Sequence, residues 1–221
     1  LAIQHGCNLL HNCNVHQWSS DSQEVKVVTD RGVEKAAQLV IAGGPWTRSL
    51  LPELSTKLQI LRKHLYWFQP ETDGFREQDG FPCFFHETDD GFFYGFPCFN
   101  GDGVKIARHS GGQPIEAPDP DVANSNTRDE KDRQLVLDYA SNYLPGLGSQ
   151  LSSSAKCYYT STPDENFVID RLPEHQNVTV VAGLSGHGFK FASALGEIAS
   201  KLALDLPMPF DLAPFAIERF K

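Results

Sequence analysis

The last quarter of the chain carries the pattern that most restricts its fold. Residues 177–182 (NVTVVA) form a short apolar run, residues 183–188 (GLSGHG) are rich in glycine, and residues 189–204 have the spacing of an amphipathic helix. This order predicts a strand buried on both faces, a tight turn and a helix, as in α/β sheets. The free N–H groups at the start of such a helix favour an anion or a dipole.

A second segment of this kind lies near the start. Residues 24–29 (EVKVVT) alternate with valine on one face and predict a half-buried strand. Residues 30–32 predict a turn that ends this strand. Residues 38–42 (QLVIA) are too short an apolar run for a helix, so they predict a buried strand, and a glycine turn leads from it into a short helix over 47–51. Both ends of the chain therefore predict α/β structure.

The middle of the chain has a different pattern. Short aromatic-rich runs separated by turn residues predict an antiparallel sheet. These runs are residues 61–69, 83–87, 91–96 and 103–109. Apolar residues at helical spacing predict a helix over 128–143, and the acidic, proline-rich residues 113–124 predict a surface loop. We therefore predict a mixed α+β and α/β fold, in which a domain of residues 1–56 and 161–221 is interrupted by a second domain of residues 57–160.

Composition excludes several classes of function. The 221 residues include 19 basic and 28 acidic side chains, giving a net charge of -9. An acidic chain without a basic stripe does not suit nucleic-acid binding. No apolar run approaches the roughly 18 residues of a membrane span, and the first residues lack the pattern of a signal peptide. The expectation is a cytoplasmic protein without nucleic-acid or membrane partners.

The start of the chain is unusual. Leu1 stands where an initiator methionine would be, and Met208 is the only methionine. Residues 1–10 resemble the end of a helix that is already under way, since no capping residue precedes them. We expect the chain to be a piece of a longer protein.

Residues in three parts of the chain could take part in catalysis or binding. Strand alternation places Lys105 and His109 on one face, where they form either a positive site or an unrelated pair on a solvent face. Alternation also places Cys157 and Tyr159 together; a cysteine is a nucleophile only where a cation or helix N-terminus stabilises its thiolate, and is otherwise a small core residue. Lys190 falls in the first turn of the last predicted helix, where a lysine opposes the helix dipole.

A group of histidines and cysteines near the start raises the alternative of a metal-binding protein. Its members are His5, Cys7, His11, Cys13 and His16. Their spacings differ from those of zinc fingers and ribbons, and the segment is predicted to change from helix to strand partway. We therefore expect no metal site here.

Five motifs, in order along the chain, carry a family resemblance. They are FYGFP at 93–97, GDGVK at 101–105 followed by His109, CYYT at 157–160, DENFVID at 164–170 and GLSGHGFKF at 183–191. Together they resemble the monomeric sarcosine oxidase and N-methyltryptophan oxidase family, flavoenzymes with covalently attached FAD. The resemblance covers roughly the C-terminal 60% of the family's polypeptide.

The resemblance implies a role for each matched residue. Cys157 would form the thioether to the flavin, Lys105 would be the oxygen-activation site, and Lys190 would hold the substrate carboxylate. Tyr94, His109 and Tyr159 would line the substrate cavity. The turn of Gly183, Gly186, His187 and Gly188 would face the flavin. Residues 1–56 and 161–221 would be the remnant of a Rossmann-like FAD-binding domain, and residues 57–160 the substrate domain with its antiparallel sheet.

The implied reaction is oxidation of a secondary N-methyl amino acid to an imine, with O2 as acceptor, giving hydrogen peroxide and formaldehyde, in a monomeric enzyme. The chain contains no P-loop, no G-x-S-x-G elbow and no G-x-G-x-x-G after a strand. Since the family's N-terminal dinucleotide cradle is absent, we expect the isolated chain to bind FAD weakly or not at all and to be inactive. Two alternatives are a noncatalytic binding domain on the oxidase scaffold and an oxidase of pipecolate or another cyclic imino acid.

Overall fold

The computed structural model describes residues 1–119 and 129–220. The chain divides into two compact units, which we call the terminal unit (Leu1–Leu58 and Thr160–Lys221) and the inserted unit (Gln59–Tyr159). The terminal unit mixes parallel and antiparallel strands with helices, whereas in the inserted unit the strand pairs β5–β8, β5–β9, β6–β7 and β7–β8 are all antiparallel. The predicted mixed fold, with an antiparallel region inserted into an α/β region, is confirmed.

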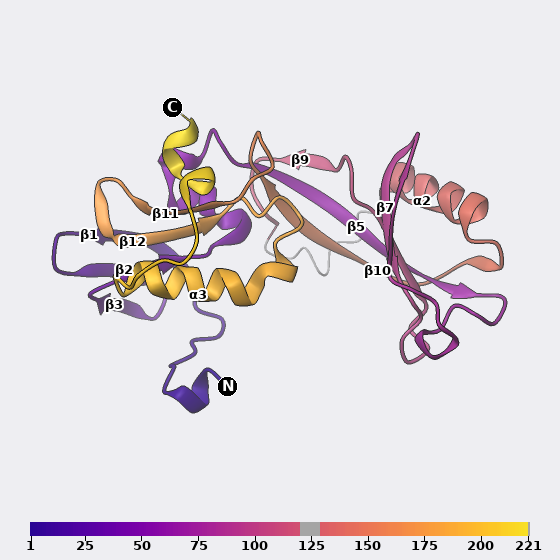
Figure 1. The fold of residues 1–221 in the computed structure, drawn as a ribbon, viewed down its shortest axis with the longest axis horizontal. Helices are drawn as coiled ribbons and strands as arrows, with labels where there is room; N and C mark the ends of the chain where they lie inside the picture. Colours follow the sequence, from indigo (N-terminus) through magenta and orange to yellow (C-terminus); the bar gives the residue numbers. More distant parts are fainter. Residues whose placement is uncertain (120–128, 221) are drawn as a thin grey trace. The chain divides into compact units, whose positions relative to one another are not determined.

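Two three-stranded sheets form the frame of the terminal unit (Figure 1). The first has the order β1-β2-β3 and is antiparallel. The second has the order β11-β12-β4; β12 is antiparallel to β11 and parallel to β4, with Val180 opposite Ile41. The strands are β1 Val15–Ser20, β2 Val25–Thr29, β3 Gly32–Ala36, β4 Leu39–Ile41, β11 Val168–Leu172 and β12 His175–Ala182. The helices and 3-10 turns are Ile3–His5, Gly44–Trp46, α1 Thr47–Leu50, Pro52–Leu54, Phe189–Phe191, α3 Ala192–Ala203, Ala213–Phe215 and Ile217–Phe220.

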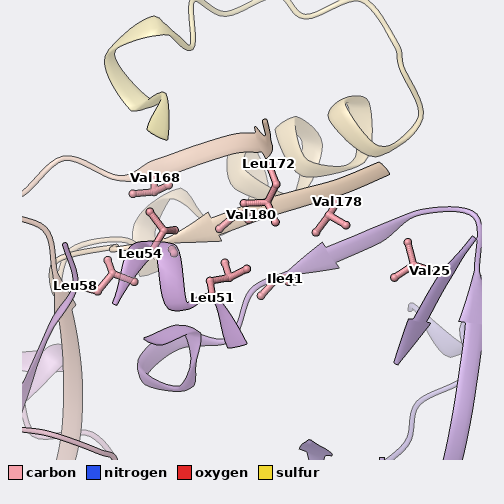
Figure 2. Close-up of a cluster of buried hydrophobic side chains, with 10 residues drawn as sticks. Val25, Ile41, Leu51, Leu54, Leu58, Val168, Leu172, Val178 and Val180 are labelled. Carbon is pink, nitrogen blue, oxygen red and sulfur yellow. The ribbon is translucent and has the colours of Figure 1, made fainter. Parts of the chain in front are cut away.

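Strand β12 is buried on both faces, as its apolar sequence predicts. One face supplies Val178 and Val180 to a cluster that Figure 2 shows between β12 and the segments around β4. That cluster consists of Val25, Ile41, Leu51, Leu54, Leu58, Val168, Leu172, Val178, Val180 and Ala182. On the other face Val181 packs with Leu195 and Ile198 of α3, which runs along the sheet (Figure 1). The strand therefore lies between two layers of apolar side chains, which fixes the position where the glycine turn begins.

Two sequence-based predictions in this unit are wrong in detail. Residues 1–10 form only the 3-10 turn Ile3–His5, in which every residue is exposed, so no apolar face stabilises a longer helix there. The helix predicted over 189–204 begins with the 3-10 turn Phe189–Phe191, and α3 starts at Ala192. Lys190 therefore lies in a 3-10 turn and outside the first turn of the α-helix.

The inserted unit is built on a six-stranded sheet. The strand order is β10-β5-β8-β7-β6, with β9 also paired to β5. The strands are β5 Gln59–Pro70, β6 Phe84–Thr88, β7 Gly91–Phe96, β8 Val104–Arg108, β9 Gln113–Ile115 and β10 Leu147–Ser161, whose last two residues belong to the terminal unit. A 3-10 turn covers Glu77–Asp79. Strand β9 occupies the start of the predicted 113–124 loop, and residues 120–124 of that loop lie outside the described residues.

Helix α2, Glu130–Tyr143, covers one face of this sheet. Asp129 caps it by accepting a hydrogen bond from the backbone N–H of Asp132 at 3.0 Å. Residue 128, the predicted start of the helix, lies outside the described residues. Phe93, Val104 and Ile106 from the sheet and Val136, Tyr139 and Ala140 from α2 are among the buried residues of the cluster between them. The other face of the sheet is therefore available to carry different side chains.

No helix of the described residues is long and apolar enough to cross a membrane.

Candidate active site

The face of the sheet that points away from α2 carries five of the ten predicted site residues: Tyr94, Lys105, His109, Cys157 and Tyr159. Strand pairing places cross-strand neighbours in rows on this face, because directly opposed residues in antiparallel strands project to the same side. The two rows are Phe85–Tyr94–Ala107 and Trp67–Lys105–Phe96. His109 follows two residues after Ala107, so β8 delivers Lys105 and His109 to the same face, as the alternation predicts.

Lys105 lies among aromatic rings. Its Nζ atom is 5.1 Å from the ring centroid of Phe96, 5.5 Å from that of Trp67 and 5.9 Å from that of Tyr94. These distances are within the range of cation–π attraction. Within residues 1–119 and 129–220 no carboxylate forms an ion pair with Lys105. The positive charge of Lys105 is therefore stabilised by cation–π contacts, and no carboxylate within the described residues neutralises it.

Two tyrosines and a histidine form a hydrogen-bonded chain. The Oη atom of Tyr159 on β10 lies 3.2 Å from Nδ1 of His109, and Tyr159 is also hydrogen-bonded to Tyr94. Burial raises the pKa of Tyr94 and of Tyr159, so both phenols keep their protons at neutral pH. The rings of His109 and Tyr94 approach each other edge-on at 6.3 Å. Three residues from three different strand segments are therefore brought together here.

Cys157 lies two residues before Tyr159 on β10 and is a half-buried free thiol. Burial raises the pKa of this thiol, and the positive charges of Lys105 and Lys63 act in the opposite direction. Burial is the larger effect, so the protonated thiol is favoured, and Lys105 and Lys63 are the two cations that would favour its thiolate.

Lys63 is a site residue that the sequence analysis missed. It lies on β5, is only 2% exposed, and its Nζ atom is 5.4 Å from the ring centroid of Tyr159. Burial lowers its pKa to about 8. A lysine inside a long apolar strand is a signal that could have been used, since charged side chains are rarely buried without a partner.

Phe85 was also missed. Its ring is 61% exposed, stacks on Phe92 at 5.6 Å and meets the ring of His109 edge-on at 5.5 Å. It therefore forms an apolar wall beside His109.

The glycine turn after β12 belongs to the terminal unit. Gly183 has φ +59 and Gly186 has φ +78, in the left-handed region that favours glycine. A Cβ atom on Gly183 would lie 2.5 Å from Cγ2 of Thr162, and one on Gly188 would lie 2.6 Å from Cβ of Leu184. The turn is therefore closely packed at its two ends.

The remaining predicted residues of this turn have different environments. His187 Nε2 lies 3.1 Å from the carbonyl oxygen of Glu165, and its ring packs against Phe167 at 4.9 Å. Lys190 is exposed, and its Nζ atom is 5.3 Å from the ring centroid of Phe191. His187 is thus fixed by its neighbours, whereas Lys190 presents its charge to solvent.

The histidines and cysteines near the start do not form a metal centre in the structure. Among the described residues no group of three or more histidine, cysteine, aspartate or glutamate side chains is arranged to hold a metal ion.

Comparisons with known proteins place the chain in a family. The family model "FAD dependent oxidoreductase" matches residues 1–202, so the chain belongs to that family. The chain is 42% identical to the N-methyl-L-tryptophan oxidase of Escherichia coli O81 (strain ED1a) over 223 aligned positions, and 41% identical to that of strain K12. These matches cover 100% of the chain and 58% of each relative. The family resemblance drawn from the five motifs is confirmed.

Solved structures share the fold. L-proline dehydrogenase from P. horikoshii matches 99% of the chain with a TM-score of 0.78 at 23% identity, and the chain covers 56% of it. Glycine oxidase from Geobacillus kaustophilus matches 98% with a TM-score of 0.77 at 20% identity, and the chain covers 54% of it. At these identities the likeness concerns the fold.

Proposed function

We propose that this chain is the substrate-side part of an FAD-dependent amine oxidase that converts a secondary N-methyl amino acid to an imine, with O2 as the final acceptor and hydrogen peroxide and formaldehyde as products. The observation that carries the proposal is the group on one sheet face of the inserted unit: Cys157 near two lysines, beside the hydrogen-bonded Tyr94, Tyr159 and His109. It stands in a chain that is 42% identical to an N-methyl-L-tryptophan oxidase.

The residues present fit a covalently held flavin. When bound, FAD supplies a two-electron acceptor that no amino-acid side chain provides. Cys157 is a half-buried thiol without a disulfide partner, and Lys105 and Lys63 both favour its thiolate. A thiolate is the form of cysteine that reacts in a covalent attachment. Cys157 is therefore the residue of this chain that would hold the cofactor.

Lys105 would stabilise negative charge. Its ammonium group is surrounded by the rings of Trp67, Tyr94 and Phe96, a setting less polar than water. A fixed cation in such a setting stabilises the negative charge that develops on dioxygen as it is reduced, without reorganising at the moment of reaction. This supports its assignment as the oxygen-activation site.

The chain of Tyr94, Tyr159 and His109 would orient the substrate. Two neutral phenols and an imidazole offer both donors and acceptors for the polar end of an amino acid. In the terminal unit, the turn of Gly183, Gly186, His187 and Gly188 is proposed to contact the cofactor, and Lys190 to bind the substrate carboxylate. In this proposal residues 1–56 and 161–221 are the FAD-binding part and residues 57–160 the substrate domain. The cytoplasmic location and the monomeric state stay predictions.

The proposal is tested by making two proteins. One is this chain alone; the other is this chain joined to the part of the Escherichia coli N-methyl-L-tryptophan oxidase that the match leaves uncovered. Both are supplied with FAD, and flavin absorbance is measured after denaturation. We expect covalent flavin only in the joined protein, together with peroxide production from N-methyl-L-tryptophan or sarcosine.

The matched control is a second cysteine. Cys157→Ser should abolish covalent flavin, whereas Cys83→Ser, which changes an exposed thiol, should leave it unchanged. Covalent flavin that persists in Cys157→Ser would refute the tether, and a joined protein that holds flavin but oxidises none of N-methyl-L-tryptophan, sarcosine and pipecolate would refute the oxidase.

A further inference from the structure

A buried ammonium group holds the turn that carries His109. Lys63 Nζ donates hydrogen bonds to three successive backbone carbonyls, those of His109 at 3.1 Å, Ser110 at 2.8 Å and Gly111 at 3.0 Å. The turn is closed around the lysine, because a Cβ atom on Gly112 would lie 2.8 Å from Cδ of Lys63. Three consecutive carbonyls that converge on one cation define the course of the chain at His109.

The strand order places Lys63 between the two members of the His109–Tyr159 hydrogen bond. Strand β5, which carries Lys63, lies between β10, which carries Tyr159, and β8, which His109 follows. On one side the lysine binds the backbone of His109, and on the other its Nζ atom lies over the ring of Tyr159. A single side chain thus contacts both partners of the 3.2 Å hydrogen bond.

We propose that Lys63 is a positioning residue that sets the geometry of the His109–Tyr159 pair. This rests on the proposed function in so far as that pair orients the substrate. Lys63 does not serve as a proton donor to substrate in this proposal, because three carbonyls use all three donors of its ammonium group. It acts through His109 and Tyr159.

Several charged groups surround Lys63. Asp132 of α2 and Cys157 of β10 favour its protonated form, and Arg108 of β8 disfavours it. Lys131 lines the same cavity of about 300 Å³ but is exposed, and the three carbonyls of the turn bind Lys63 instead. Lys131 is therefore the matched control, because it lines the same cavity as Lys63 but does not bind the three carbonyls.

The test uses NMR of the 221-residue chain, so it requires neither flavin nor amine. Signals of ring-labelled histidine and tyrosine are recorded, with His109→Gln and Tyr159→Phe identifying the two residues. In Lys63→Met we expect the ring signals of both His109 and Tyr159 to move, because Lys63 contacts both residues. Lys63→Arg should restore at least half of the wild-type shift, and Lys131→Met should change neither signal.

Two results would overturn the proposal. One is a folded Lys63→Met chain whose His109 and Tyr159 signals coincide with those of the wild type. The other is an equal change in Lys131→Met. If Lys63→Met does not fold, the wild-type chain is titrated from pH 7 to about 9.5, because Lys63 titrates at about 8. The two ring signals must then inflect at the midpoint of the Lys63 side-chain signal, and an absence of that inflection overturns the proposal.

The joined protein separates this inference from the proposed function. If wild type oxidises the amine, Lys63→Met should lower kcat/KM, expressed per mole of bound flavin, by about tenfold, and Lys63→Arg should recover most of the loss. If wild type has no activity, the proposed function fails, whereas the NMR result still decides whether Lys63 positions the pair.

Discussion

His109 and Tyr159 are separated by 50 positions in sequence, yet Nδ1 of the first lies 3.2 Å from the hydroxyl oxygen of the second. Tyr159 also bonds to Tyr94, so its hydroxyl is the centre of the polar group on this sheet face. Removal of that one oxygen atom disconnects the histidine from both phenols.

Tyr159→Phe in the joined protein should lower kcat/KM by about 10- to 100-fold, because the half-buried His109 imidazole and the half-buried Tyr94 phenol lose a hydrogen-bond partner. Steady-state kinetics with N-methyl-L-tryptophan measure this. The adjacent Tyr158→Phe is the control, since the Tyr158 hydroxyl bonds to the backbone N–H of Asp119 at 2.7 Å. Its kcat/KM should stay within about twofold of wild type. Equal losses in both variants would contradict a special role for Tyr159.

Lys105→Met should slow reoxidation by O2 and leave reduction by substrate nearly unchanged. A missing fixed charge costs on the order of 100- to 1,000-fold in a step that develops negative charge. Stopped-flow absorbance follows the two half-reactions separately in the joined protein. Lys131→Met controls for the general loss of a positive charge. A variant slowed equally in both half-reactions would argue for a role in substrate binding instead.

Gly183→Ala should destabilise the chain by about 3 kcal/mol, since it adds the strain of a positive φ to a close contact with Thr162. Gly196→Ala in α3 should stabilise it by about 0.5–1 kcal/mol, because a Cβ there meets nothing within 4 Å. Denaturant unfolding of the 221-residue chain measures both. Similar effects of the two substitutions would show that the turn is not closely packed.

Stability should depend on pH through Lys63. Its pKa is lowered from 10.5 to about 8 in the folded chain, mainly by burial. Between these values the unfolded chain binds more protons, so this group makes folding more favourable as pH rises from about 8 to 10.5. Below about 8 both states are protonated and the contribution is constant.

The measurement compares wild type with Lys63→Met in urea at several pH values. The difference in unfolding free energy should change in favour of wild type by at most about 1.4 kcal/mol per pH unit above pH 8. Lys131→Met should show no such trend. A difference that is flat from pH 7 to 10 would mean that Lys63 keeps an ordinary pKa.

Phe85→Ala tests the apolar wall beside His109. If an aromatic substrate side chain packs on this exposed ring, the variant should raise KM for N-methyl-L-tryptophan by about tenfold, and KM for the smaller sarcosine much less. Competition between the two amines in the joined protein gives the ratio directly. An unchanged ratio would place the substrate side chain elsewhere.

Local patterns predicted much of the fold, because they record which side of a segment is apolar. The valines of β12, the strands β2, β4 and β5 to β8, and the helices α1 and α2 all appear where periodicity indicates them. The part of the long strand β10 before residue 156 was missed, since its serine-rich sequence has little apolar alternation and it is held by pairing with β5. Strands β3 and β11 were missed for a similar reason, being short and polar in part.

Strand alternation already indicated that Lys105 shares a face with His109, and Cys157 with Tyr159, because its period is two. The sequence also carried the motifs that identify the family. Which of these pairs meet depends on the strand order β10-β5-β8, because that order brings together strands that are far apart in sequence. The same strand order puts Lys63 between His109 and Tyr159. The contacts of Lys63 with these two residues depend on which strands are neighbours in the sheet, and the periodicity of a single segment does not encode this.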